Sequence, residues 1–316
     1  MNPDLSRAVA DSVDYLRSPR ALASLENDPY WPKWDSPWWH VLALEEAGEV
    51  AAIPRSMVQA LMDATGRHYV PFFPKHESEL PPGKDFYAHV ICHCALGLLL
   101  RALLACGLNG EAGIPWAKGW FLRYLFPDGG FNCDEKAYSR AAPKSSLIST
   151  LPPLEYLLAL GEQRPLTADE VAILDGGAAY LLAHRVVCSA STGNVIRADW
   201  LVPSLPRFYE YDALRGLAFL VRWAERRRRP FARRDVALAL SALERHFGSD
   251  PPPGPRRWHV EHQTRAITPS GEPGWGPSSS FALLEAMNAG GRALLEEEWR
   301  EAKRGLERLE ADGLVS

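Results

Sequence analysis

The sequence lacks several features that mark nucleic-acid-binding or secreted proteins. Its formal net charge is -4 over 316 residues, so no overall basic field attracts nucleic acid. The five cysteines are odd in number and irregularly spaced, which argues against a disulfide framework. The first residues lack the basic start and unbroken apolar run of a signal peptide. These absences predict a cytoplasmic protein with reduced cysteines.

Long apolar runs and strand-like alternation are also scarce. No apolar run reaches the roughly 18 residues needed to cross a membrane, and the longest, residues 90–104, contains His93 and Arg101. We therefore expect no transmembrane segment. Alternating apolar and polar residues, which are typical of half-buried strands, are nearly absent. This scarcity argues against a β-rich fold.

What the chain has instead is helical spacing of apolar residues almost from end to end. Hydrophobic residues make up 47% of the chain, enough for a large core. Thr167 and Glu170 have the spacing of a capping box at a helix start. We predict helices over residues 11–25, 37–47, 54–64, 86–106, 115–126, 145–160, 167–185, 211–226, 233–246, 278–290 and 294–309.

The predicted helices form pairs whose members differ in polarity. The first helix of each pair is apolar on nearly every side, as in residues 147–158, whereas the second is amphipathic, as in residues 296–304. A helix that is apolar all round is buried, and an amphipathic one covers it. First helices recur every 50 to 67 residues or so, a spacing typical of repeats. We predict one all-α domain over 1–316, an α/α toroid of five to six helical hairpins with inner and outer layers; an open superhelix or two bundles are the alternatives.

Several short motifs resemble those of a known family. Residues 117–122 and 128–132 resemble the aromatic and glycine repeat of terpenoid cyclases and protein prenyltransferase β subunits. Asn132-Cys133, the serines at 145–146, and residues 211–217 and 276–279 are closer still to bacterial relatives described as squalene-cyclase-like or prenyltransferase-like. The similarity covers roughly residues 30–290. It implies an α/α toroid whose central cavity holds an isoprenoid-like ligand.

The sequence departs from this family at its catalytic motifs. The Asp-x-Asp-Asp motif that protonates an alkene and the Asp-Asp-x-x-Asp motif that binds magnesium and diphosphate do not occur. Protein prenyltransferases bind zinc through Asp, Cys and His, but Asp212 has no neighbouring cysteine. The resemblance therefore leaves open whether the protein is an enzyme.

In a ring of hairpins the inner helices all start at one mouth, where their loops bring polar side chains together. For acid–base chemistry we single out Asp212 as acid or base, because a carboxylate among aromatic rings can have a raised pKa, with Asp134, Lys144 and Tyr211 orienting the substrate. A helix cap or ion pair is the structural alternative for these residues. Predicted substrate-binding residues are Trp34, Asp128, Asn132, Glu210 and Trp275.

Histidines and cysteines near residue 90 suggest a metal site as a further alternative. His89 and His93 are four residues apart and share a helix face, and Cys133 or His262 could supply a third ligand. Histidines on apolar helices are more often hydrogen-bonded core residues. We therefore assign no metal or other cofactor, although a divalent metal stays open.

The sequence thus predicts a protein that binds an apolar or amphiphilic small molecule in a central cavity and leaves its transformation open. A carbohydrate-active enzyme with six hairpins would use paired carboxylates in an aromatic cleft, with Asp128 or Asp134 beside Asp212. A binding scaffold without catalysis is the third alternative. Residues 1–30 are expected to form an N-terminal helix, and residues 248–276 a long loop that could cover the cavity. The sequence makes no prediction of oligomeric state.

Overall fold

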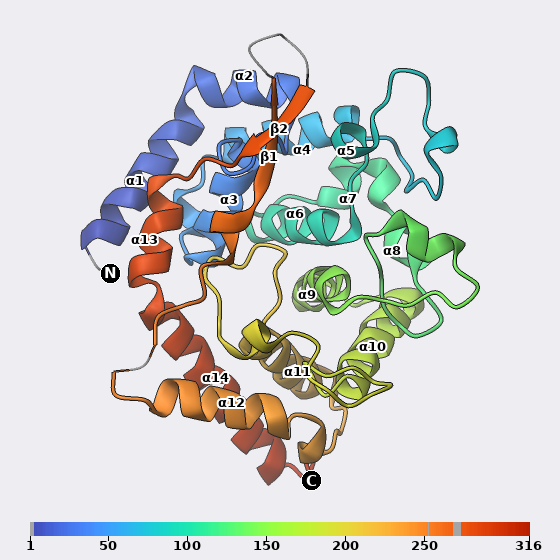
Figure 1. The fold of residues 1–316 in the computed structure, drawn as a ribbon, viewed down its shortest axis with the longest axis vertical. Helices are drawn as coiled ribbons and strands as arrows, with labels where there is room; N and C mark the ends of the chain where they lie inside the picture. The colour runs from blue at the N-terminus through green and yellow to red at the C-terminus, as the bar shows by residue number, and fades with distance from the viewer. Residues whose placement is uncertain (1–2, 252, 268–272) are drawn as a thin grey trace.

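A computed structural model describes residues 3–251, 253–267 and 273–316, and most of them lie in helices (Figure 1). The predicted all-α class is confirmed to that extent. The helices are α1 (Pro3–Arg17), α2 (Pro19–Asn27), α3 (Pro37–Glu46), α4 (Arg55–His68), α5 (Phe86–His89), α6 (His93–Ala105), α7 (Gly110–Gly113), α8 (Trp120–Tyr124), α9 (Leu147–Gln163), α10 (Ala168–Ala183), α11 (Ala213–Arg227), α12 (Ala237–Gly248), α13 (Ala282–Gly290) and α14 (Arg292–Ala311). The strands are β1 (Gln263–Ile267) and β2 (Pro273–Pro277).

The helices differ in how much of their surface they bury. In α3, α6 and α9, most side chains are buried on all sides, as the sequence predicted for these segments. In α14, only one stripe that includes Leu295, Trp299 and Leu306 is buried. Thr167 and Glu170 form the predicted capping box at the start of α10.

Contacts between the helices run from α3 around the molecule and back to α3. Helix α6 lies between α3 and α9, and α9 also contacts α10 and α11. Helix α11 packs on α14, α14 contacts α13, and α13 contacts both α1 and α3. Figure 1 shows α6 and α9 in the middle of the view, with α1, α2, α12 and α14 at the periphery.

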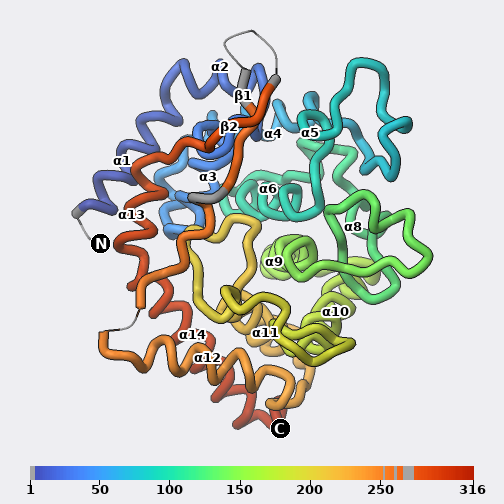
Figure 2. The backbone as a smooth tube through the Cα atoms, viewed as in Figure 1, coloured from blue at the N-terminus to red at the C-terminus, as the bar shows by residue number. Residues whose placement is uncertain are grey.

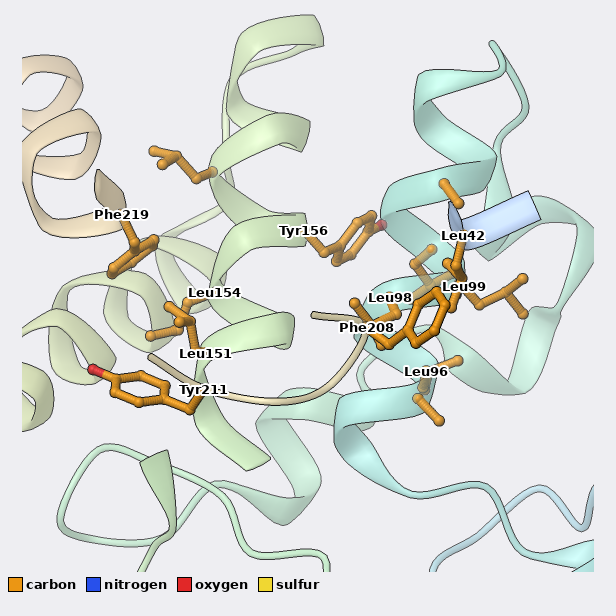
Figure 3. Close-up of a cluster of buried hydrophobic side chains, with 14 of the residues drawn as sticks. Leu42, Leu96, Leu98, Leu99, Leu151, Leu154, Tyr156, Phe208, Tyr211 and Phe219 are labelled. Atoms are coloured by element: carbon orange, nitrogen blue, oxygen red, sulfur yellow. The ribbon is translucent and has the colours of Figure 1, made fainter. Parts of the chain in front are cut away.

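The core at the middle of the molecule joins α6, α9 and α11. Figure 3 shows Leu151 and Leu154 of α9 beside Phe219 of α11, whereas Phe208 gathers with leucines of α6 on the other side. All of these side chains are at most 3% exposed. Burying a side chain of this size stabilises the fold by about 1.5–3 kcal/mol.

The tightest approach in this core is between the backbones of α6 and α9 at Gly97. A Cβ atom on Gly97 would lie 2.6 Å from the nitrogen of Pro153 and 2.9 Å from the carbonyl oxygen of Pro152. Both prolines lie inside α9, where they lack the N–H group that a helix interior uses. Glycine lets the two helices touch along their backbones.

We expect Gly97→Ala to destabilise the protein by about 1–3 kcal/mol, because the added methyl group collides with backbone that cannot rotate away. Urea unfolding followed by circular dichroism measures this. Gly66→Ala in α4 is the control, since its Cβ would lie an ordinary 3.5 Å from the Gly113 oxygen. The control should be neutral or slightly stabilising. Equal stability of the two variants would contradict the close approach.

Four segments differ from the sequence prediction. The predicted helix over 115–126 is a 3₁₀ turn at Pro115–Ala117 followed by the short helix α8, because Gly119 between them has a left-handed conformation. The N-terminal segment is two helices, because Pro19 starts α2 and Ser18 caps it by accepting a hydrogen bond from the Ala21 N–H. The predicted helix over 86–106 is broken after His89 and resumes at His93. The predicted loop over 248–276 contains an antiparallel pair in which Gln263 faces Pro277. Residues 252 and 268–272 of that loop lie outside the described part.

The pair of strands covers the loop that precedes α3 (Figure 2). The backbone N–H of Lys33 donates a 2.6 Å hydrogen bond to Thr264 Oγ1. Arg265 of β1 forms an ion pair with Asp85, and Trp258 of the preceding segment donates its indole N–H to the Pro206 oxygen at 2.9 Å. The segment that we expected as a lid therefore packs on the loops before α3 and α11.

One segment, Phe86–Ala105, is long and apolar enough to cross a membrane by length and composition. Its mean hydropathy is 1.8, but 67% of the window is buried inside the structure. A core helix of a folded domain has the same composition. The described residues therefore contain no clear transmembrane segment.

Candidate functional site

Loops that precede the buried helices contact one another at the amino ends of those helices. The Trp34 ring, before α3, stacks on Phe208, before α11, with ring centroids 5.3 Å apart. Cys133 Sγ, in the loop before α9, lies 3.6 Å from Cys94 Sγ in the first turn of α6. The predicted site residues belong to this end of the molecule, but they do not converge on one cavity.

Asp212 is completely buried at the start of α11. Its carboxylate accepts hydrogen bonds from the Arg215 N–H at 2.9 Å, from the Ser204 N–H and hydroxyl at 3.0 Å each, and from Arg207 Nε at 2.9 Å. Burial raises the pKa of Asp212, but Arg207 and the N–H groups outweigh it and bring the pKa below its ordinary value. Asp212 therefore caps α11 and forms an ion pair with Arg207. This is the structural role that the sequence analysis gave as the alternative to catalysis.

Tyr211 and Asp134 are also held by structural partners. Tyr211 is 1% exposed, and its hydroxyl donates to the Val186 oxygen at 2.7 Å. Asp134 caps a short 3₁₀ turn by accepting from the Lys136 N–H, and it also forms an exposed ion pair with Arg140. Tyr211 and Asp134 therefore take part in structural contacts, whereas Lys144 lines a groove elsewhere.

Lys144 and Asp128 lie together in a groove of about 730 Å³ between the start of α9 and the end of α10. Asp128 accepts hydrogen bonds from the Ser145 hydroxyl at 2.5 Å and from the Ser145 N–H at 3.0 Å. Tyr180 and Trp200 contribute rings to the groove. Of the predicted site residues, Lys144 and Asp128 are the two that line one groove.

The remaining predicted binding residues are scattered. Trp34 is 1% exposed, so it cannot form the wall of an open cavity. The Asn132 amide donates to the Lys144 carbonyl oxygen at 2.8 Å. Glu210 is buried near Arg256, and burial raises the pKa of its carboxyl group. Trp275 is 51% exposed and packs edge-on against Trp31.

Lys33, which the sequence analysis did not select, is the main buried cation among these aromatic rings. Its ammonium group lies 4.9 to 5.9 Å from the centres of five rings and donates to the Tyr209 hydroxyl at 2.8 Å. Burial lowers the pKa of Lys33 to about 8. The sequence offered one indication of this arrangement, because Lys33 is the single lysine within the aromatic run at residues 30–34.

The cysteines near α6 gather more closely than the histidines do. Cys92 Sγ lies 3.2 Å from Cys94 Sγ, and the sulfur atoms of Cys92, Cys94 and Cys133 all lie within 4.8 Å of one another. We call these three residues the cysteine triad. All are free thiols, and Cys92 and Cys133 are partly exposed.

The predicted histidine ligands point to other partners. His93 accepts a 2.9 Å hydrogen bond from the Trp120 indole and lies 2.7 Å from the Tyr138 hydroxyl. His89 accepts from the Asp85 N–H at 3.0 Å. His262 lies 3.3 Å from the Tyr209 hydroxyl. Cys133 does join a candidate metal-binding group, but that group consists of cysteines.

A second cavity region lies at the opposite, carboxyl end of α3, α6 and α9. Two adjoining hollows of about 620 and 310 Å³, which we call the basin, open there. Much of the apolar part of the lining, which we call the apolar wall, comes from α11 and α14, although these helices also contribute charged side chains. That wall consists of Ala218, Val221, Leu294, Leu295 and Ala302.

The rest of the basin is charged, with an excess of acids. Eight glutamates and five arginines line the two hollows, so the formal balance is 5 − 8 = −3. The glutamates are Glu45, Glu46, Glu155, Glu162, Glu225, Glu297, Glu298 and Glu301, and the arginines are Arg101, Arg207, Arg215, Arg222 and Arg308. None of the described residues that line the basin is aromatic.

A network of buried ion pairs forms the floor of the basin. Arg101 bridges Glu45 at 2.6 Å and Glu155 at 2.7 Å, and Arg215 binds both carboxylate oxygens of Glu155 at 2.7 Å. Burial raises the pKa of Glu155, but the two arginines outweigh it and lower that pKa to about 2. Glu155 therefore stays ionised.

The pKa of Glu46 is shifted in the opposite direction to that of Glu155. The Glu46 carboxylate accepts from the N–H groups of Arg207 at 2.6 Å and Phe208 at 2.5 Å, and it lines both hollows. Burial raises its pKa above the ordinary value, against the effect of Arg215 and Arg101. Two carboxyl groups whose pKa values are displaced in opposite directions can serve as proton donor and ionised partner in one site.

Comparison of the chain with protein-family models, with curated proteins and with solved structures finds no match. The functional argument therefore depends on the geometry above.

Proposed function

We propose that the helices form an α/α toroid similar to that of terpenoid cyclases and prenyltransferases, and that the basin binds an amphiphilic small molecule. The circuit of contacts from α3 to α13 and back supports the ring. The positions of three charged residues support the ring as well. Glu45, Arg101 and Glu155 each lie eight residues after the first residue of their helices, which start at 37, 93 and 147. Three helices joined by ion pairs at one level are expected to run parallel.

The proposal of an amphiphilic ligand is based on the lining of the basin, which is partly apolar and partly charged. A volume of about 620 Å³ suits a drug-sized molecule. The apolar wall of α11 and α14 would hold an alkyl or isoprenoid-like chain, and the acidic excess favours a cationic head group. An entirely apolar ligand would strip water from Arg101, Arg207 and Glu298 without replacing its hydrogen bonds.

Acid–base chemistry, if the ligand is transformed, would use the same basin. Glu46 is the carboxyl group that burial favours in the protonated form, and Glu155 is the one that arginines keep ionised. The carbohydrate alternative is less favoured, because sugar sites commonly use aromatic faces and no described lining residue is aromatic.

The test compares three decyl probes in isothermal titration and thermal-shift measurements: decylammonium, decanoate and decanol. We expect decylammonium to bind roughly tenfold more tightly than decanoate, a difference of about 1.4 kcal/mol. Binding to the native state alone raises the melting temperature. Equal affinity for all three probes would contradict an acidic amphiphile site.

Ala218→Trp should abolish decylammonium binding, because the indole fills the space along the apolar wall. Leu238→Trp is the matched control, since Leu238 lies on α12 outside the basin and is 38% exposed. Circular dichroism establishes that both variants are folded. A folded Ala218→Trp protein that binds the probe as tightly as the unmodified chain would place the ligand elsewhere.

A further inference from the structure

We propose that the cysteine triad, Cys92, Cys94 and Cys133, binds one zinc ion at a site separate from the basin. The observed sulfur separations include 3.2 Å and 3.6 Å, and no pair exceeds 4.8 Å. Two thiolates about 2.3 Å from one tetrahedral zinc lie roughly 3.8 Å apart. Zinc binding therefore requires only small movements of the three side chains.

The backbone holds the triad in place through the two most closely packed helices. Cys92 immediately precedes α6, and Cys94 lies in its first turn. The N–H of Cys133 donates to Ser149 Oγ at 3.0 Å, which ties the loop to α9. Gly97 fixes the approach of α6 to α9. A metal site whose ligands come from rigid elements is preorganised.

The ligand set and its surroundings favour zinc. Three sulfur ligands suit soft or borderline ions and disfavour magnesium and calcium, which prefer oxygen. Three thiolates leave a Zn²⁺ complex with a charge of −1, whereas a Cu⁺ complex carries −2. The complex with the smaller net charge costs less to hold among buried and partly buried residues, so the site favours zinc over copper.

Three protein ligands leave one position of a tetrahedral zinc open. Among the described residues no fourth His, Cys, Asp or Glu joins the triad, so a water molecule or a small ligand would complete the tetrahedron. Catalytic zinc sites keep such an open position, whereas structural sites are closed by four protein ligands. The site is therefore of the open kind.

The experiment uses the full chain produced with zinc in the medium and purified without chelator under reducing, anaerobic conditions. Elemental analysis is expected to find one zinc per chain. Replacement by Co²⁺ is expected to produce a thiolate-to-cobalt charge-transfer band. Zinc-free protein that neither takes up zinc in competition with a chromogenic chelator nor produces this band would overturn the proposal.

Cys92→Ser and Cys133→Ser should each bring the zinc content close to zero, whereas Cys106→Ser and Cys188→Ser, outside the triad, should retain one zinc per chain. Circular dichroism and the melting temperature identify any variant that fails to fold, and the cobalt spectrum of the unmodified chain decides the outcome in that case. Full zinc content in a folded Cys133→Ser protein, or a disulfide within the triad after anaerobic purification, would overturn the assignment.

Discussion

Arg215→Met is expected to lower the free energy of unfolding by about 3–5 kcal/mol, because it leaves buried acceptors without their donor. Arg215 is 3% exposed. Its guanidinium group binds both oxygens of Glu155 and also donates to the backbone oxygens of Phe208 and Glu210 at 2.7 and 2.6 Å. Methionine replaces the apolar stem of arginine but cannot donate to any of these acceptors.

Urea unfolding of the variant and of a matched control measures this effect. Arg226→Met removes an arginine that is 58% exposed and pairs with Glu162, so it should cost at most about 1 kcal/mol. Adding Glu155→Leu to Arg215→Met should recover part of the loss, because it removes a buried carboxylate that has lost one of its two arginine partners and keeps only Arg101. If Arg215→Met costs no more than the control, the buried network does not stabilise the fold as the structure indicates.

Acidification is expected to destabilise the protein from pH 6.5 downward because His40 must stay neutral in the folded state. Its ring is 5% exposed and lies 4.0 Å from Phe281 and 4.3 Å from Tyr15, measured between ring centroids. Burial, together with Arg20, lowers the pKa of His40 to about 3. Between pH 6.5 and 3 the unfolded chain therefore takes up a proton that the folded chain does not.

The stability lost through His40 should reach roughly 3 kcal/mol at pH 4.5 relative to pH 7. Urea unfolding between these pH values tests this, with His40→Gln as the variant that cannot titrate and His76→Gln, on the surface, as control. His40→Gln should flatten the pH dependence by that amount, and His76→Gln should not. Glu155, whose pKa is also lowered, contributes mainly below pH 4.5, outside the measured window. An unchanged slope in His40→Gln would contradict the buried neutral histidine.

Local patterns in the sequence predicted the helices well. The apolar segments at 37–47 and 145–160 are the buried helices α3 and α9, and the Thr167–Glu170 capping box is present. These signals act over a few residues. The β1–β2 pair escaped prediction, because its strands are short, β2 contains prolines and glycines, and their pairing joins residues up to 14 positions apart (277 − 263).

The site was harder to predict than the fold. Asp212 looks like an isolated acid among aromatic residues in the sequence, yet Arg207 and Ser204 enclose it in the structure. Conversely, Arg101 and Glu155 each appear as one charged residue within an apolar stretch, and Glu45 as one of two glutamates at the end of another. Their ion pairs link positions 54 and 56 residues apart, and no local pattern reveals such pairs.

The sequence by itself determined where most helices begin, which of them are buried and that several loops meet at the amino ends of α3, α6, α9 and α11. Helix caps and apolar periodicity depend on neighbouring residues, so they can be read along the chain. Only the tertiary structure decided that aromatic rings close that end, that the charged hollow lies at the opposite end, and that three cysteines meet beside α6. Those features depend on how side chains from distant segments fill space, and packing of that kind is settled only when the helices come together.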